Sequence, residues 1–276
     1  MEFRTRHVRV ADLGFEFEVI EGDTIIGPAI EKGSWEPHET ALFRAHLERG
    51  ARVLDLGANI GWFAVQAILA GAEVHAFEPV PAIAAIAERN ISNANRRGPG
   101  IGKLYPYAAG AARGKARIAL ARGNHGDNRV VDGAVPADMG EAETVEIAIE
   151  RVDDHLSGPF RVIKIDTQGS EWLALQGAQK LLEASTQCAL LMEFWPYALR
   201  GCKPEQLLAR LDELGFTLGK ATAAPFPMRP ERILKQALAR DPVKGGLDLY
   251  GTRGAPFHVL GLGARMHGMW RSSREP

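Results

Sequence analysis

Three acidic residues each close a short apolar run that is typical of a buried β-strand: Asp55, Glu78 and Asp166. In an open parallel sheet, ligands bind beyond the carboxyl ends of the strands, where the strand order switches. Side chains at those ends therefore converge on one crevice. A carboxylate such as Asp55 would repel a pyrophosphate there, but it would attract a cationic ammonium such as that of a methionine moiety.

The segment 55–61 (Asp-Leu-Gly-Ala-Asn-Ile-Gly) is expected to turn the chain from a strand into a helix. Gly57 can adopt a tight turn that lets a ligand approach the backbone, and Gly61 lets the helix pack near the strand. We expect Asp55, Gly57, Ala58, Asn59 and Gly61 to bind a cofactor. A dinucleotide turn would read G-x-G-x-x-G, but Asn59 stands where its second glycine belongs, so a pyrophosphate would meet a side chain.

Glu78 and Pro79 lie about 20 residues beyond the glycine turn, where nucleoside-binding folds place a ribose. A carboxylate at this place can accept hydrogen bonds from both ribose hydroxyls. Enzymes that bind NAD and enzymes that bind S-adenosylmethionine both use this arrangement, so Glu78 indicates a ribose without deciding between the two. The alternative is a surface acid that is stabilised by the dipole at a helix start.

A general base contributes roughly 10²–10⁴-fold to a reaction that removes a proton from a hydroxyl. Three residues are candidates for such a base. Asp166 is expected to point into the crevice, where it could instead bind the cofactor or orient the acceptor. His125 lies in a polar loop and has an ordinary pKa suited to proton transfer near neutrality, although a loop histidine without a role is the alternative. Glu193 closes the strand 189–192, where it could equally stabilise a neighbouring tryptophan or a helix start.

The remaining candidate binding residues lie in expected loops and at a strand end. Trp35 and Glu36 could close over the cofactor as a lid, or could be a loop residue and a helix-capping acid. The backbone near Ala108 could meet the adenine edge, or pack as plain strand. Asp127 and Asn128 could bind acceptor hydroxyls, although an Asx turn explains them nearly as well.

We predict no metal site. Asp166, Glu171 and Glu193 have no recognisable ligand spacing, and Glu171 is expected to be a solvated helix residue.

The elements that must position these residues alternate between strand and helix, which predicts an α/β fold with a mostly parallel, twisted sheet and helices on both faces. We expect a hairpin over 15–26 and a helix over 37–47 in an N-terminal extension, 1–50, that could act as the lid. A catalytic domain, 51–255, and a C-terminal tail, 256–276, follow. The elements expected in the domain are strands at 51–55, 73–78, 103–107, 117–120, 144–149, 161–166, 188–193 and 247–251 and helices at 62–70, 79–93, 170–182 and 204–214.

The bulk composition adds few constraints. The chain has 276 residues and a formal net charge of −1, so no bulk field favours nucleic acid, and we expect no nucleic-acid partner. Cys188 and Cys202 have no metal or disulfide spacing, which favours reduced thiols and a cytoplasmic location. No apolar stretch is long enough to span a bilayer. The oligomeric state cannot be predicted.

Three blocks of sequence together resemble the FkbM family of class I methyltransferases: 53–61 (VLDLGANIG), 76–79 (AFEP) and 163–171 (IKIDTQGSE). The upstream segment 33–36 (GSWE) and Asn90 are also similar to family positions. The resemblance implies a Rossmann-like class I fold, S-adenosylmethionine as cofactor, and O-methylation of a hydroxyl on a sugar or a polyketide-like natural product. One departure is Gln168, since the family segment commonly reads Asp-x-Glu-Gly, and this puts any role of that carboxylate in doubt.

The sequence therefore predicts an S-adenosylmethionine-dependent methyltransferase that acts on a small-molecule or glycan acceptor. Two alternatives stay open. An NAD(P)-dependent oxidoreductase would share the fold but would have to bind a dinucleotide over Asn59. A non-catalytic module would bind S-adenosylmethionine and methylate nothing.

Overall fold

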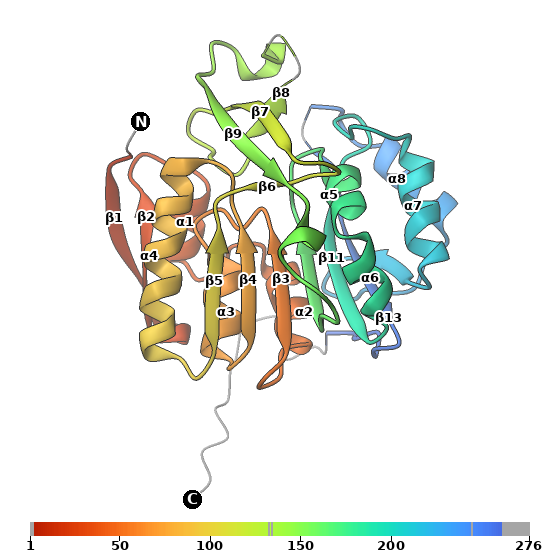
Figure 1. The fold of residues 1–276 in the computed structure, drawn as a ribbon, viewed down its shortest axis with the longest axis horizontal. Helices are drawn as coiled ribbons and strands as arrows, with labels where there is room; N and C mark the ends of the chain where they lie inside the picture. The colour runs from red at the N-terminus through yellow and green to blue at the C-terminus, as the bar shows by residue number, and fades with distance from the viewer. Residues whose placement is uncertain (1–2, 132, 134, 244, 261–276) are drawn as a thin grey trace, which may run out of the picture.

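A seven-stranded sheet forms the centre of the chain in a computed structural model that describes residues 3–131, 133, 135–243 and 245–260 (Figure 1). The strand order is β12-β13-β11-β10-β3-β4-β5, in which β13 is antiparallel to its neighbours and the pairs from β11 to β5 are parallel. Its strands are β3 (Arg52–Leu56), β4 (Glu73–Phe77), β5 (Ile101–Tyr105), β10 (Val162–Ile165), β11 (Cys188–Phe194), β12 (Thr217–Lys220) and β13 (Leu247–Arg253).

Apolar side chains on the two faces of this sheet pack against different helices. On one face, Val53, Val74 and Val162 belong to the core that also contains residues of α2, α3 and α4. On the other face, Leu54 and Ile163 belong to a core with residues of α5 to α8. The helices are α1 (Ile26–Glu31), α2 (Pro37–Ala45), α3 (Trp62–Leu69), α4 (Pro81–Arg97), α5 (Glu171–Gly177), α6 (Gln179–Ala184), α7 (Pro204–Glu213) and α8 (Pro230–Leu238). The predicted α/β fold is therefore confirmed.

The strand order reverses between β3 and β10, because the chain runs outward from β3 to β4 and β5 on one side and from β10 to β11 on the other. Such a switch leaves a crevice at the carboxyl ends of the two strands. Asp55 lies in β3, and Asp166 directly follows β10. The fold thus places these two acids on the neighbouring strands that border the switch point.

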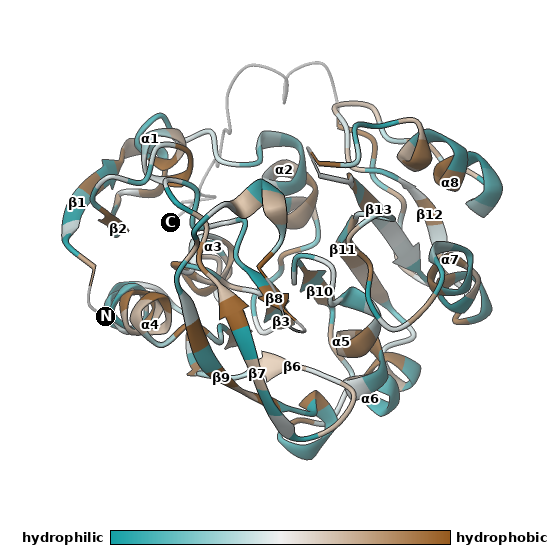
Figure 2. Cartoon of the chain, turned by 90° about the horizontal axis from the view of Figure 1, so that it is seen from above, coloured by the Kyte–Doolittle hydropathy of each residue, from teal (hydrophilic) through white to brown (hydrophobic). Residues whose placement is uncertain are grey.

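A four-stranded sheet of order β6-β9-β7-β8 lies above the carboxyl ends of β3, β4 and β5 (Figure 1). Its strands are β6 (Ala108–Ala109), β7 (Gly114–Ala119), β8 (Arg129–Val131) and β9 (Thr144–Glu150). Seen from above in Figure 2, hydrophilic and hydrophobic segments alternate along β7 and β9, as expected for strands that cover an interior with one face. This sheet therefore covers the crevice.

The N-terminal hairpin lies earlier in the chain than the sequence pattern predicted. Strands β1 (Thr5–Val10) and β2 (Phe15–Ile20) pair around a turn at 11–14, whereas 26–31 form α1. The alternation over 15–26 was misleading because Asp23 starts a helix, its Oδ1 accepting the amide N–H groups of Ile25 and Ile26. The helix expected over 37–47 is present as α2.

Three further differences concern the C-terminal half. The helix expected over 170–182 is broken between α5 and α6, where a Cβ on Gly177 would collide with the Gly110 backbone and Asp153 accepts the amide N–H groups of Lys180 and Leu181. Strand β12 and helix α8 were not predicted. Much of the expected tail, 261–276, lies outside the described residues, and the three domain boundaries stay predictions. Within the described segments, none of the helices combines the length and apolar character needed to cross a bilayer.

Candidate active site

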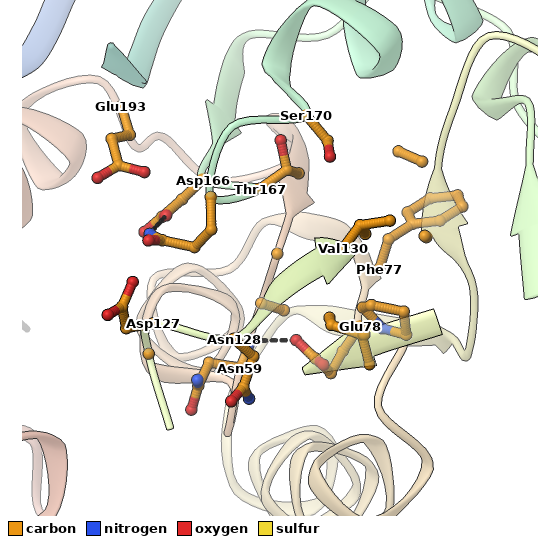
Figure 3. A pocket seen from close by; sticks show the side chains of 18 of the residues that line it. Asn59, Phe77, Glu78, Asp127, Asn128, Val130, Asp166, Thr167, Ser170 and Glu193 are labelled. Atoms are coloured by element: carbon orange, nitrogen blue, oxygen red, sulfur yellow. Dashed lines mark hydrogen bonds between the residues drawn. The ribbon is translucent and has the colours of Figure 1, made fainter. Parts of the chain in front are cut away.

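A cavity of about 700 Å³ opens at the carboxyl ends of the central strands, beneath the four-stranded sheet. This volume falls within the range of roughly 300–1,000 Å³ that is usual for small-molecule sites. Figure 3 shows Phe77, Glu78 and Val130 along one side of it, and Asp127, Asp166 and Glu193 along the other. We name these the β4 side and the β11 side.

The turn after β3 joins three strands at the floor of the β4 side. The amide N–H groups of Gly57 and Ala58 both donate to the Phe77 carbonyl oxygen at 2.9 Å. Gly57 has φ +87°, and a Cβ there would collide with the carbonyl of Asp166. Glycine is therefore needed for the close approach of β3 and β10, and not only for a ligand. Asn59 has φ +50°, a conformation that asparagine tolerates better than most residues.

Glu78 presents a preorganised carboxylate to the cavity. Its Oε2 accepts the Asn59 amide N–H and its Oε1 accepts the Val80 amide N–H, each at 3.0 Å. Burial raises the pKa of Glu78 to about 7, although these two hydrogen bonds oppose the rise. Each oxygen keeps a lone pair, so the group can still accept two hydroxyl hydrogens side by side.

Apolar residues continue the β4 side beyond Glu78. Phe77, Pro79, Tyr107, Ala108 and Ile149 line the cavity here. A carboxylate beside an apolar slot fits an adenosine, whose ribose is a vicinal diol and whose base is flat. The residues on the β4 side thus fit the nucleoside part of S-adenosylmethionine.

Two residues of the expected cofactor turn do not line the cavity. Asp55 is 1% exposed, and neither carboxylate oxygen has a hydrogen-bond partner among the described residues. Burial raises its pKa to about 6, against the opposing attraction of Lys164. Gly61 has φ +90° at the start of α3, where a Cβ would touch Ile91 and Ala87 at ordinary distances. Asp55 can act on the cavity through its charge, and Gly61 shapes the helix start; their direct contact with a cofactor stays a prediction.

Asp166 lies on the β11 side with both oxygens engaged. Lys164 Nζ donates to Oδ2 at 2.9 Å, and Gln168 Nε2 donates to Oδ1 at 2.7 Å. Gln168 has φ +49°. Both carboxylate oxygens of Asp166 therefore already accept a hydrogen bond from the same short segment.

Glu36 and Trp35 line the same cavity from the segment before α2. Glu36 has φ +43°, and its Oε2 lies 3.8 Å from Lys164 Nζ. Burial raises the pKa of Glu36, against the attraction of Lys164. Glu36, Asn59 and Gln168 are the non-glycine residues with positive φ in the described part of the chain, and all three line the cavity. Such strained conformations concentrate at functional sites.

Glu193 differs from Asp166 in its partners. It lies at the carboxyl end of β11, and its Oε2 is buried without a hydrogen-bond partner in the described structure. Burial raises its pKa well above the ordinary value, and the nearby carboxylates of Asp166 and Glu171 raise it further. Of the three predicted bases, Glu193 therefore has the environment of a strong proton acceptor.

The loop 123–128 lines the cavity, and its polar side chains are hydrogen-bonded within the loop and to residues next to it. Asp127 accepts two hydrogen bonds from Arg129, at 2.9 and 2.8 Å. Asn128 accepts the Ala121 amide N–H and donates to the His125 carbonyl. The side chains of Asp127 and Asn128 thus hold the loop through these partners, while both residues also line the cavity, so binding of acceptor hydroxyls stays a prediction.

His125 lines the cavity, but its ring packs against Phe3 at 4.6 Å between centroids. Its Nδ1 is buried and has no hydrogen-bond partner within the described ranges, and burial lowers its pKa. The backbone of His125 is fixed from outside the loop, since its N–H donates to Asp23 and its carbonyl accepts from Asn59 Nδ2 at 2.9 Å. The loop is therefore tied both to the N-terminal extension and to the turn after β3.

Two charged residues of the site were missed or misjudged from the sequence. Glu171 is 0% exposed and not solvated; its Oε1 accepts the amide N–H groups of Thr167 and Gly169 at 3.1 and 3.0 Å. Lys164 was missed altogether, although a lysine inside the apolar run 162–165 is itself a signal that a buried anion lies nearby. The prediction of no metal remains a prediction.

Comparison with known proteins identifies a family model that matches this chain. The family model described as the methyltransferase FkbM domain matches residues 55–218, more than half of the 276-residue chain. No curated protein matches.

Three solved structures are similar to the chain. A methyltransferase FkbM from Methylobacillus flagellatus KT has 18% identity and a TM-score of 0.47, over 78% of this chain and 48% of that one. A TehB-like SAM-dependent methyltransferase from Corynebacterium glutamicum ATCC 13032 has 14% identity and a TM-score of 0.43, over 82% and 93%. The magnesium protoporphyrin IX methyltransferase of Synechocystis PCC 6803, crystallised with bound SAM, has 13% identity and a TM-score of 0.45, over 83% and 84%.

The chain spans about half the length of the Methylobacillus protein. The family match covers the turn after β3, Glu78 and the segment 163–171, which are the blocks on which the resemblance was based. That resemblance is confirmed: the chain belongs to the FkbM family of S-adenosylmethionine-dependent methyltransferases.

Proposed function

We propose that this protein transfers the methyl group of S-adenosylmethionine to a hydroxyl oxygen of a small-molecule or glycan acceptor, with Glu193 as the general base. The observation that carries the proposal is the Glu193 carboxyl, which lines the cavity and whose buried Oε2 has no hydrogen-bond partner in the described parts of the chain. Methyl transfer to a hydroxyl is helped by such a proton acceptor, because a neutral hydroxyl is a weak nucleophile and loses its proton in the reaction.

The β4 side would hold the cofactor. Glu78 would accept the ribose hydroxyls, Ala108 and its neighbours would contact the adenine, and the turn 57–59 would lie under the nucleoside. Trp35, Glu36 and Asp166 would surround the methionine part, with Asp55 adding negative charge from behind the wall. When bound, S-adenosylmethionine supplies an electrophilic methyl carbon whose departing sulfur takes up the bonding pair.

The chain's own residues supply position and proton transfer. Holding two reactants in a productive orientation can contribute on the order of 7–11 kcal/mol to lowering the barrier. The loop 123–128 covers the cavity and excludes water, and Asp127 and Asn128 would orient the acceptor through their remaining lone pairs. As the acceptor oxygen forms its bond to carbon, its proton passes to the Glu193 carboxylate.

His125 and Asp166 are less suited to the proton transfer. The His125 ring packs on Phe3, and both oxygens of Asp166 already accept hydrogen bonds. The NAD(P)-dependent alternative loses its support, because the chain belongs to a methyltransferase family.

The test is transfer of a radiolabelled methyl group from S-adenosylmethionine to a panel of glycans and hydroxylated metabolites, with amines and carboxylic acids of matched size beside them. We expect label in an ether that resists mild base. Label in an ester or an amine would overturn the proposal that the acceptor group is a hydroxyl. Binding of the cofactor with no transfer to any acceptor would favour the non-catalytic module.

A further inference from the structure

Two side chains of the same short segment hold both oxygens of the Asp166 carboxylate. Lys164, two residues before it, donates to Oδ2 at 2.9 Å, and Gln168, two residues after it, donates to Oδ1 at 2.7 Å. Hydrogen bonds to a charged carboxylate are shorter and stronger than those between neutral groups. Two donors, one on each oxygen, fix the plane of the Asp166 carboxylate. Asp166 thus faces the cavity in one orientation.

Burying the ammonium group of Lys164 at this position costs free energy. It is 5% exposed within β10, whose other residues, Val162, Ile163 and Ile165, are fully buried. A buried ammonium must be compensated by charge and hydrogen bonds. Asp166 compensates it at 2.9 Å and Glu36 at 3.8 Å, and Nζ also lies 4.6 Å from the centre of the Phe63 ring. Burial lowers the pKa of Lys164, but the carboxylates of Asp166, Glu36 and Asp55 together outweigh that effect and raise it.

Gln168 is held in an unfavourable backbone conformation. Its φ of +49° is uncommon for a residue other than glycine, asparagine or aspartate. Its side chain makes a direct hydrogen bond to Asp166, which places the amide N–H₂ on the one oxygen that Lys164 leaves open. A strained residue that donates to a site carboxylate is more consistent with a functional constraint than with a free choice of turn residue.

We propose that Lys164 and Gln168 are positioning residues: they hold the Asp166 carboxylate as a fixed negative charge toward the cationic cofactor, and proton transfer is left to Glu193. This rests on the proposed function for the identity of the ligand. The two carboxyls of the β11 side then have separate tasks that follow from their partners, since Asp166 has two donors and Glu193 Oε2 has none in the described structure.

A substitution at Gln168 tests this more directly than one at Asp166, because it removes a donor and leaves the charges unchanged. The charged groups around Asp166 belong to many elements, and none of them is altered by a change at Gln168: Lys164 of β10, Glu36 before α2, Asp55 of β3, Glu78 after β4, Glu171 of α5, Glu193 of β11 and Asp248 of β13.

The experiment is a double-mutant cycle on the Kd of S-adenosylmethionine, measured by calorimetry without acceptor. Gln168→Met keeps the length of the side chain and removes its donor, and it should weaken binding about tenfold, because the Asp166 side chain must then be ordered when the cofactor binds. Asp166→Asn should weaken binding at least as much. In the Asp166→Asn background, Gln168→Met should change the Kd less than twofold, because its effect passes through the Asp166 charge.

The matched control is Gln179→Met, because Gln179 also donates to a carboxylate, that of Glu183, but lies exposed on α6. It should bind like the wild type. Thermal unfolding of each ligand-free variant shows that the fold is intact. In steady state, Gln168→Met should raise the KM for S-adenosylmethionine more than it lowers kcat.

Two results would overturn the proposal. The first is a Gln168→Met variant whose Kd for S-adenosylmethionine lies within twofold of the wild type. The second is a double variant whose Kd rises by the product of the two single effects. A wild-type protein that binds no S-adenosylmethionine would instead reject the proposed function, so the two failures are distinct. Lys164→Met should weaken binding at least tenfold; where that variant does not fold, the Gln168 cycle decides.

Discussion

The two sides of the cavity are built in different ways. On the β4 side, the turn and Glu78 lie close in sequence, from Gly57 to Pro79, and the Glu78 carboxylate is held by backbone N–H groups; later segments add only the apolar residues beside it. The β11 side collects residues from Glu36 to Gly245, and its carboxylates are held by side chains or lack a hydrogen-bond partner among the described residues. In the proposed function, the ribose is thus held by one local unit, whereas the methionine part and the acceptor depend on the packing of distant segments.

The largest expected effect concerns proton transfer on the β11 side. Glu193→Gln should lower kcat by roughly 10²–10⁴-fold, the usual contribution of a general base. The Kd of S-adenosylhomocysteine should change little, because Glu78 and the turn after β3 are untouched. Steady-state kinetics and calorimetry on the same protein give both values.

In the wild type, kcat should rise with pH, because burial raises the pKa of Glu193 and a base acts only after it has lost its proton. That rise should disappear in Glu193→Gln. Glu231→Gln, an exposed change on α8, is the control. A Glu193→Gln enzyme with undiminished kcat would remove the distinction between the two sides.

The next effect concerns the β4 side. Glu78→Gln should weaken S-adenosylhomocysteine about 10- to 100-fold, because a neutral amide replaces a charged acceptor and its N–H₂ faces a backbone donor. In the wild type, affinity should fall as the pH drops below about 7, where Glu78 takes up a proton. The variant should show a flatter profile. Calorimetry between pH 6 and 8 checks this, with Glu88→Gln on the exposed face of α4 as control; equal profiles would exclude Glu78 as the ribose acceptor.

A third effect separates binding from stability. Asp55→Asn should stabilise the ligand-free protein at pH 8 by on the order of 2–3 kcal/mol, because burial raises the pKa of Asp55 from 3.8 to about 6 and its ionisation in the folded state is unfavourable. The stability that the protonated form contributes is lost as the pH rises through 6, so the difference should shrink toward pH 5.

Urea unfolding at the two pH values measures this difference, and Asp212→Asn on the exposed face of α7 is the control. The same substitution should weaken cofactor binding, since a site that costs stability is expected to serve function. Destabilisation at pH 8 would show that Asp55 has a structural partner.

This contrast also explains what the sequence could predict. The β4 side was accessible because Gly57, Asn59 and Glu78 lie in one strand–turn–helix–strand unit, whose spacing fixes their positions. Asp166 and Glu193 could be placed at strand ends by the same logic. The hydrogen bonds of these two acids could not be predicted. Nothing in the sequence indicates that Gln168 donates to Asp166, or that Glu193 Oε2 lacks a donor among the described residues. β6, β8 and α8 lay in segments without strong periodicity, whereas β7 and β9 were expected as strands at 117–120 and 144–149. Asp55 does not line the cavity, so its contact with a cofactor stays a prediction.

The smallest expected effect tests the bond that joins the two sides. Asn59 belongs to the turn after β3, but its Nδ2 donates to the His125 carbonyl of the loop 123–128 at 2.9 Å. Asn59→Gly accepts the φ of +50° without strain and removes that bond together with the local one that Asn59 Oδ1 accepts from the Ile60 amide N–H, whereas Asn59→Ala adds the strain. Since the loop is also tied to Asp23, we expect the acceptor KM to rise only about threefold in Asn59→Gly, near the lower limit for one neutral hydrogen bond. The Kd of S-adenosylhomocysteine should stay within twofold, because the Asn59 backbone N–H still donates to Glu78. Should both constants move together, the two sides would be one cooperative unit and the comparison would fail.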